Sequence, residues 1–575
     1  MTKKLSYLNS ESFSKYFRYY SIYTVLFFLY LASFIFVGFF LHIYINSWTL
    51  ITAFVSYGII LLIFFAFQRV RIKQLVLIFL SLIITSLVFW GLATVFGHTY
   101  DTSYDGQDYH QSAVIELSDK WNPIYQKAMP IKLTNKIDGP VVSGYGKIIW
   151  AIDSSIYKLT HNIDSATVIN LIVGMLAFSF VFFALRSLKI DIFLSSVTSF
   201  LIVVTTIFVE QIFTLREDSI SYGFFLIGVS SAICILVNQK KLLYFWCLVT
   251  SLIFLAGTKY SNLFIFIPLL VLSLYVVINE NIYKLKAFKV SLVLGIIISF
   301  ICLFNPYITN IFRYHAIDYP FNQKIFANSL KIDNIPSNIR NDGKIKLLYY
   351  GIFSSPVISD PQSLVKAHIK APFTLSYDQL LIEAMSASKT VGGYGVFFGG
   401  IFILSLVGYL FLFIKRKSQE EKKIFWILSL ALISIITTCL LSPVPNYARY
   451  GSQLFLFPIS IVLAFLVIAD NKWTREKIFA VLLIILMFLN IILDTEFAAA
   501  IDTQNFQKIN SQLTSLKDSN KAYLVYSGSF YSVYAKLKLH GINYLISQKP
   551  INCNNIIVLD DSGGSPTTPT DLCRL

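Results

Sequence analysis

Long apolar segments recur through this 575-residue chain and constrain its fold more than any other feature. Runs of roughly 17 to 25 apolar residues are long enough, as helices, to cross the hydrocarbon core of a bilayer. Lipid offers no partners to backbone polar groups, so helices are the expected spanning structure. Only 14% of the residues are charged, against about 25% in soluble proteins. We therefore predict an all-α polytopic membrane protein and exclude a disordered, fibrous or small secreted chain.

Thirteen transmembrane helices are expected, each bounded by charged or turn residues. The predicted spans are Ile22–Tyr44, Leu50–Phe67, Leu75–Phe96, Ala166–Leu185, Ile192–Val209, Ile220–Val237, Leu242–Ala256, Leu263–Ile278, Val290–Phe304, Val396–Ile414, Ile424–Leu441, Leu454–Ile468 and Ile478–Leu493. The first is too long and too aromatic for a cleaved signal sequence, so we expect it to remain in the mature chain.

The distribution of Lys and Arg predicts the orientation. Twenty-two of them fall in one alternating set of connections, between Lys3 and Lys477, whereas the opposite short hairpins hold at most one each. By the positive-inside rule, the N-terminus is cytoplasmic, and after thirteen spans the C-terminus is extracytoplasmic. This bias accounts for much of the net charge of +16, so no nucleic-acid partner is needed to explain it.

The spans divide the chain into six parts. They are three N-terminal spans (1–96), a first extracytoplasmic loop (97–164), six spans (165–304), a second large loop (305–395), four spans (396–493) and an extracytoplasmic C-terminal domain (494–575). In that domain, strand-like runs at Ala522–Ser527, Ile542–Ile546 and Ile556–Leu559 surround a helix-like Tyr531–Leu539, which predicts a small α/β domain. Cys553 and Cys573 share it, but two cysteines alone do not decide whether they form a disulfide.

The first loop concentrates acidic residues directly after the third span. Asp101, Asp105, Asp108 and His110 fall within ten residues of one another. A carboxylate there can act as a general base towards a hydroxyl, ligate a metal or remain a solvated loop charge. Residue type alone leaves these three interpretations open.

Further charged residues lie at other predicted outer helix ends: Arg216, Glu217 and Asp218 before the sixth span, Lys259 between the seventh and eighth, and Arg449 before the twelfth. If these ends meet, cations can hold a phosphate while a carboxylate takes a proton. The alternatives are an ion pair at a helix N-terminus and lysine or arginine reaching the membrane interface. The amphipathic segments Val114–Leu117 and Ile148–Leu159 are expected to lie along that interface.

One run of the first loop carries a family resemblance. Tyr104–Gln111 followed by Trp121–Pro123 resembles the first outer loop of an uncharacterised group of bacterial multi-span proteins identified as cell-surface glycan glycosyltransferases. Later segments resemble that group in the same order: Gly146–Lys147, Ile156–Thr160, Asn305–Asn310, Tyr319–Pro320, Gly392–Gly395 and Ala448–Gln453. The architecture is similar to GT-C type enzymes, which include the aminoarabinose and protein O-mannosyl transferases.

The resemblance implies transfer of a sugar, with inversion, from a polyprenyl-phosphate donor to a glycan, lipid or protein acceptor outside the bacterial cytoplasmic (inner) membrane. It maps the base onto Asp105, with Asp101 and Asp108 as neighbours. Asp108 stands where that family usually has an aromatic residue, so the choice between Asp105 and Asp108 stays open. A second acidic site would correspond to Glu217 or Asp218.

Charge and position make three residues candidates for the donor phosphate, and two more stand beside the predicted base. The phosphate candidates are Lys259, Arg449 and Arg216, and the neighbours are Tyr109 and His110. A divalent metal is neither required nor excluded. Two other classes of function compete: a flippase or exporter of lipid-linked sugars, and a glycan polymerase or ligase.

Overall fold

The computed structural model describes residues 2–67, 72–126, 138–237, 240–324, 335–358, 366–385, 389–416, 418–469, 474–528, 530–553, 556–559 and 570–574. Within these residues, twelve helices are long and apolar enough to cross a membrane, which confirms a helical multi-pass architecture. They are α1 (Thr2–Phe40), α2 (Thr49–Phe67), α3 (Ile72–Phe96), α7 (Val168–Ser187), α10 (Asp218–Leu236), α11 (Lys241–Thr258), α12 (Leu263–Asn279), α13 (Lys286–Leu303), α18 (Phe398–Lys415), α19 (Gln419–Leu441), α20 (Leu456–Ala469) and α21 (Arg475–Asp518).

The predicted fifth span is the one that differs. Instead of one helix over Ile192–Val209, the chain forms a short α8 (Ile192–Val203) and a separate α9 (Thr206–Gln211). Val204 leaves helical geometry, and the Thr205 hydroxyl caps the new helix by accepting a hydrogen bond from the amide of Phe208 at 3.3 Å. The prediction of one continuous helix there was wrong, because Val204 leaves helical geometry and the Thr205 cap starts a new helix.

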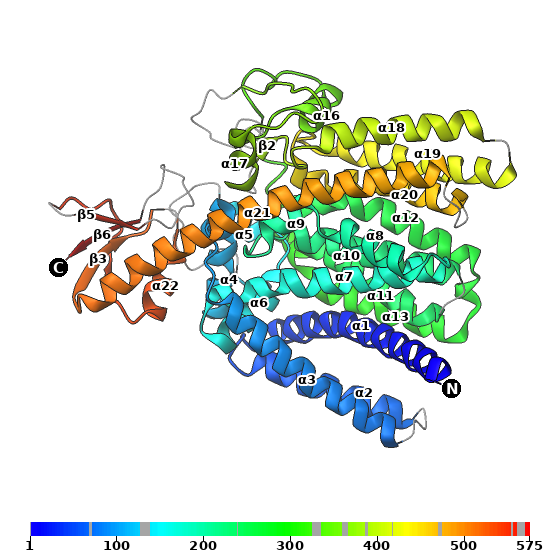
Figure 1. Ribbon diagram of the computed structural model, residues 1–575. Helices are drawn as coiled ribbons and strands as arrows, with labels where there is room; N and C mark the ends of the chain where they lie inside the picture. Colours follow the sequence, from blue (N-terminus) through cyan, green and yellow to red (C-terminus); the bar gives the residue numbers. More distant parts are fainter. Residues whose placement is uncertain are drawn as a thin grey trace.

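The short helix α8 packs against the long helices α7, α20 and α21. The N-terminus of α1 and the C-terminal end of α21 lie at opposite ends of the helical bundle (Figure 1).

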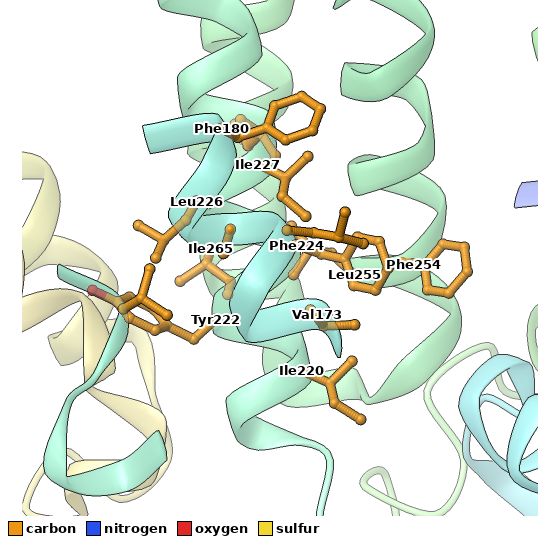
Figure 2. Close-up of a cluster of buried hydrophobic side chains, with 14 of the residues drawn as sticks. Val173, Phe180, Ile220, Tyr222, Phe224, Leu226, Ile227, Phe254, Leu255 and Ile265 are labelled. Atoms are coloured by element: carbon orange, nitrogen blue, oxygen red, sulfur yellow. The ribbon is translucent and has the colours of Figure 1, made fainter. Parts of the chain in front are cut away.

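The centre of the bundle forms around α10. Its aromatic and aliphatic side chains pack against α7, α11 and α12, and Figure 2 shows Phe224 lying beside Phe254, with ring centroids 4.2 Å apart. On α10, Gly223 also allows the close approach of α7, because a Cβ at this position would lie 2.6 Å from Val173 Cγ1. Small residues at crossing points are the usual way for membrane helices to approach closely.

The first loop folds into short helices that pack inside the protein. They are η1 (Gly106–His110), α4 (Gln111–Ser118), α5 (Asp138–Gly144), α6 (Ile148–Thr160) and η2 (Ile163–Thr167). Every residue of α4 is buried, as are Ile148–Ile156 of α6. The interfacial placement predicted for these amphipathic segments was therefore wrong. Their apolar residues face each other and the helices α1 and α11, not lipid.

Further short elements connect the long helices. They are η3 (Tyr260–Asn262), η4 (Ile282–Lys284), η5 (Phe304–Ile308), α14 (Thr309–Tyr314), α16 (Lys344–Phe353), β1 (Val357–Ile358), α17 (Tyr377–Met385), β2 (Lys389–Val391), η6 (Ala448–Tyr450) and η7 (Ser452–Phe455). β1 and β2 pair antiparallel. Among them, α16, α17 and β2 of the second loop lie at the same end of the bundle as the first loop (Figure 1).

The C-terminal domain stands on the end of α21. At about 1.5 Å per residue, this 44-residue helix is about twice as long as a bilayer's hydrocarbon core is thick. Beyond it follow β3 (Ala522–Tyr526), α22 (Val533–Leu539), β4 (Asn543–Ile546), β5 (Ile556–Leu559) and β6 (Thr570–Arg574). They form one sheet in the order β4-β3-β6-β5, with β3 and β4 parallel. The small α/β domain is confirmed; its fourth strand, β6, was not predicted.

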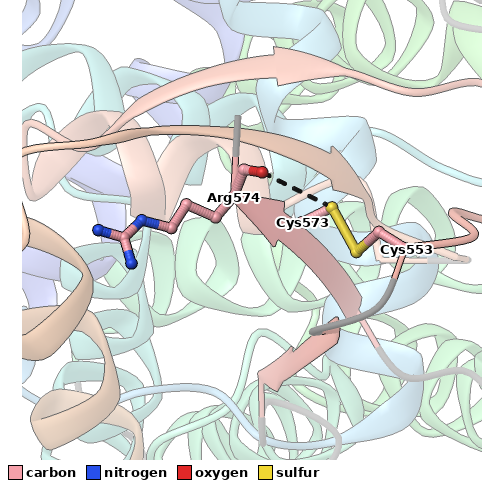
Figure 3. Close-up of a disulfide and its surroundings, with 3 residues drawn as sticks. All are labelled: Cys553, Cys573 and Arg574. Carbon is pink, nitrogen blue, oxygen red and sulfur yellow. Dashed lines mark hydrogen bonds between the residues drawn. A yellow bond between two sulfur atoms is a disulfide. The ribbon is translucent and has the colours of Figure 1, made fainter.

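Cys553 and Cys573 form a disulfide, which the sequence left undecided. Cys553 lies in the connection between β4 and β5, and the disulfide links this connection to strand β6, which contains Cys573 (Figure 3). The other cysteines are single buried residues in helices: Cys234, Cys247, Cys302 and Cys439.

Candidate functional site

Five charged side chains from four segments of the chain meet where several long helices end. We name this group the basic cluster; it consists of Asp105, Arg216, Asp218, Lys259 and Arg449. Asp105 precedes η1, Asp218 begins α10, Lys259 follows α11, and Arg449 lies in η6 between α19 and α20. The sequence left the meeting of these helix ends as a condition, and the structure brings them together.

Asp105 bridges two arginines. Its Oδ2 atom lies 2.6 Å from Arg449 Nη1 and 3.6 Å from Arg216 Nη2. Both arginine side chains are almost fully buried, whereas the Asp105 side chain is 23% exposed. Asp105 is thus the carboxylate through which solvent or a ligand can reach the cluster.

Asp218 organises the other half of the basic cluster. Its Oδ1 atom accepts a hydrogen bond from Lys259 Nζ at 2.8 Å, and its Oδ2 atom lies 3.4 Å from Arg449 Nε. Gln211 also donates to Oδ2, at 3.1 Å. Arg449 therefore connects both carboxylates, and removing it would disturb the whole group.

The cluster holds three cations against two carboxylates, so its formal charge is positive by one. Burial would raise the pKa of Asp105, but Arg216 and Arg449 hold that pKa well below its usual range. Burial would lower the pKa of Lys259, but Asp218 beside it keeps the pKa above its usual value. Both residues are charged at neutral pH, and an excess cation in a buried site favours an anionic ligand.

The two neighbouring loop aspartates have different surroundings. Asp101 is fully buried; its carboxylate accepts hydrogen bonds from Ser103 and, at 2.8 Å, from the backbone N–H of Leu215. It therefore ties the loop to the segment that carries Arg216. Asp108 lies in η1 with 2% of its surface exposed. Asp105 forms ion pairs with both Arg216 and Arg449.

Glu217 does not join the ion pairs. It is fully buried, and among the described residues neither carboxylate oxygen has a hydrogen-bond partner. Burial raises its pKa well above the usual range despite the charge of Lys259. The two acidic residues proposed for a second site thus differ: Asp218 forms ion pairs with Lys259 and Arg449, whereas Glu217 is buried beside them with a raised pKa.

His110 and Tyr109 lie beside the cluster but make other contacts. His110 Nδ1 accepts a hydrogen bond from Trp150 Nε1 at 2.8 Å. Burial, followed by the charge of Lys259, lowers the pKa of His110 to about 3, so its ring is neutral. Tyr109 packs edge-on against Tyr145 and Trp150. These contacts give both residues a supporting position.

A small polar pocket opens next to the basic cluster. It is lined by Asp218, Ser221, Tyr222, Ser261, Asn262, Ile265, Arg449, Tyr450, Ser452 and Gln453. Its volume of about 20 Å³ holds about one water molecule. A phosphate therefore enters the cluster only if a present partner of the cations moves.

The Asn305–Asn310 segment forms hydrogen bonds with the first loop. Asn305 donates to the carbonyl of Pro123 at 2.9 Å, and Asn310 donates to the carbonyl of Gly144 at 3.0 Å. These bonds fasten the chain after α13 to the first loop. Residues of the family-like motifs that are far apart in sequence thus hold the two loops together.

The C-terminal domain contacts the acidic loop directly. Lys536 donates to the Gln107 side chain at 3.2 Å, and Tyr100 and His540 are hydrogen-bonded at 3.0 Å. Tyr104 of the loop packs edge-on against Phe530. The domain therefore braces the segment that carries Asp105.

Sequence reasoning missed two groups of polar residues. Asp164 accepts from the backbone N–H of Asp101 at 3.1 Å and so supports the loop. A second buried charge group combines Glu210, Glu383, Lys389 and Asp494. Their separation in sequence gives no local spacing signal; only the unusual position of Asp494, just beyond an apolar span, marks one of them.

Comparison with protein-family models, curated proteins and solved structures finds no match to this chain.

Proposed function

We propose that this chain is a membrane glycosyltransferase that moves a sugar from a polyprenyl-phosphate donor to a glycan, lipid or protein acceptor, with inversion. The reaction takes place on the extracytoplasmic side of a bacterial cytoplasmic membrane, with the N-terminus in the cytoplasm. The observation that carries the proposal is the contact of the partly exposed Asp105 with two buried arginines. The sequence resemblance described above supports the same assignment.

The proposed chemistry divides between the two kinds of charge. The acceptor oxygen forms a bond to the anomeric carbon while the bond from that carbon to the phosphate oxygen breaks. Asp105 takes the acceptor's proton, and the bonding electrons leave with the polyprenyl phosphate. Arg216, Lys259 and Arg449 stabilise the charge that develops on that phosphate.

The present ion pairs imply a sequence of events. An aspartate whose pKa is held low by two arginines is a weak base. In this proposal the donor phosphate displaces Asp105 from Arg216 and Arg449. The freed carboxylate then becomes more basic and turns towards the acceptor, so donor binding precedes activation of the acceptor.

The location supports transfer over transport. The basic cluster lies at the ends of α10, α11 and α19. Transporters concentrate ionisable groups near the middle of the membrane, in broken helices. Here the charged groups face the loops and the C-terminal domain, where an acceptor outside the membrane has access.

Mass spectrometry of surface glycans and of polyprenyl-phosphate sugars tests the proposal in cells that express the wild type or Asp105→Asn at equal levels. Asp119→Asn is the matched control, because Asp119 lies in the same loop and is 64% exposed. We expect Asp105→Asn to lose one sugar from the glycan and to accumulate its lipid-linked donor. Unchanged glycans in Asp105→Asn would contradict the proposal.

A further inference from the structure

We propose that Glu210, Glu383 and Asp494 form a binding site for one divalent cation of the oxygen-preferring type, such as Mg²⁺, Mn²⁺ or Ca²⁺. With Lys389 they form what we name the acidic cluster. Glu210 lies in α9, Glu383 in α17, Lys389 in β2 and Asp494 in α21. The site thus joins four elements that are far apart in sequence.

The carboxylates are close enough to share one ion. One oxygen from each of Glu210, Glu383 and Asp494 lies within 4.8 Å of the other two. The centre of such a triangle is at most about 2.8 Å from each oxygen, and small movements give the 2.0 to 2.6 Å typical of Mg²⁺ and Ca²⁺. All three donors are carboxylates, which suits Mg²⁺, Ca²⁺ or Mn²⁺.

Asp494 gives an independent indication of a ligand. It is 2% exposed, and among the described residues neither of its carboxylate oxygens has a hydrogen-bond partner. The Oε2 atom of Glu383 also has none. A buried carboxylate without a partner costs free energy, and a cation between these oxygens satisfies them together.

Charge points to the same occupant. Lys389 forms an ion pair with Glu210 and lies 4.0 Å from Glu383 Oε1. One ammonium group against three carboxylates leaves two formal negative charges in a buried site. A single divalent cation would neutralise them, whereas a monovalent cation would not.

The bound cation would hold the second loop to the bundle. Glu383 Oε1 accepts a hydrogen bond from the backbone N–H of Gly395 at 2.7 Å, so the ion would also fix the Gly392–Gly395 turn. Asp494 would anchor that turn to α21, the helix that carries the C-terminal domain. This inference concerns binding and does not rest on the proposed transferase activity.

Metal binding tests this site on the purified full chain in detergent after chelator treatment. Mn²⁺ is titrated and followed by electron paramagnetic resonance, with metal content measured by mass spectrometry. Three variants are compared with the wild type: Asp494→Asn, Glu383→Gln and, as the matched control, Glu496→Gln, which changes an exposed carboxylate on the same helix. Asp105→Asn reports on binding at the basic cluster.

We expect the wild type, Glu496→Gln and Asp105→Asn to bind one Mn²⁺ with equal affinity. Asp494→Asn and Glu383→Gln should weaken that binding by at least about 10-fold. Even mutation of a residue that only hydrogen-bonds to a metal ligand typically lowers metal affinity by about 10- to 100-fold. Absence of saturable Mn²⁺ binding in the wild type would overturn the proposal and indicate that protons neutralise the cluster. Loss of binding in Asp105→Asn, with retention in both acidic-cluster variants, would place the ion elsewhere and overturn it as well.

Discussion

Two buried charge groups lie at the same end of the bundle and differ in sign. The basic cluster has three cations and two carboxylates, whereas the acidic cluster has one cation and three carboxylates. The two clusters are adjacent at Gln211. This residue directly follows Glu210 of the acidic cluster, and its side chain donates a hydrogen bond to Asp218 of the basic cluster. Neighbouring sites of opposite excess charge can therefore bind an anion and a cation without sharing a residue.

The two clusters also differ in access. Asp105 is 23% exposed and contacts the arginines of the basic cluster, so a ligand can reach it. The side chains of Glu210, Glu383, Lys389 and Asp494 are each nearly or fully buried. The difference indicates exchange of ligands at the basic cluster and a permanent structural role at the acidic one.

Removal of the only cation of the acidic cluster should have the largest effect. Lys389→Met leaves three carboxylates without their ammonium partner, and breaking a buried pair in this way costs about 3–5 kcal/mol of unfolding free energy. Thermal unfolding in detergent measures the loss, which added Mn²⁺ should partly restore. Lys538→Met, at an exposed position of the C-terminal domain, is the control and should change stability by less than about 0.5 kcal/mol. Equal stability of the two variants would contradict the conclusion that Lys389 stabilises the three carboxylates of the acidic cluster.

Removal of the accessible carboxylate of the basic cluster should act on the reaction. Asp105→Asn should lower the rate of transfer at least about 100-fold, because an amide cannot accept the acceptor's proton. The helical content and the yield of membrane-inserted protein should stay as in the wild type. Full activity in Asp105→Asn and also in Asp108→Asn would refute the assignment of the base to this loop.

Removal of the shared arginine should act on the donor. Arg449→Ala takes a partner from Asp105 and from Asp218, and losing one buried charged partner costs roughly 2 kcal/mol or more, or about 30-fold in donor KM. Steady-state kinetics with the lipid-linked sugar measure the change. Arg574→Ala, which alters an exposed arginine, should leave KM unchanged. An unaltered donor KM in Arg449→Ala would exclude Arg449 from the phosphate site.

The pH dependence should show the smallest effect and the most specific one. In the free enzyme the arginines hold the pKa of Asp105 well below its usual range, so this group stays ionised and active as pH falls towards that low value. If the donor phosphate takes the arginines, the pKa of Asp105 rises in the complex. The acid limb of kcat should then lie at least about one pH unit above that of kcat/KM. Coinciding limbs would contradict displacement of Asp105.

Much of the fold was predictable because a membrane span is a local property of the sequence. Twelve of the thirteen predicted spans coincide with long helices. The break after Val203 depends on one hydroxyl cap at Thr205, a signal too weak to read against an apolar run. The burial of α4 and α6 was not predictable either, since an amphipathic pattern does not say whether its apolar face meets lipid or protein.

The two clusters show the same limit for function. Each member of the basic cluster stands near a predicted helix end, so position and charge marked these residues as candidates, although the sequence left their meeting as a condition. Glu210, Glu383, Lys389 and Asp494 belong to segments with no common pattern, and only folding brings them together. Likewise, the choice between Asp105 and Asp108 depends on which carboxylate faces the arginines, which residue type does not specify.

Transfer by the purified chain in lipid nanodiscs tests the central claim most directly. The protein is incubated with polyprenyl-phosphate sugars and envelope acceptor from the cells that make it, and release of free polyprenyl phosphate is followed by mass spectrometry. Wild type and Asp119→Asn should release it together with a glycosylated acceptor, whereas Asp105→Asn should bind the donor without releasing it. Equal release by Asp105→Asn, or none by the wild type, would contradict the account.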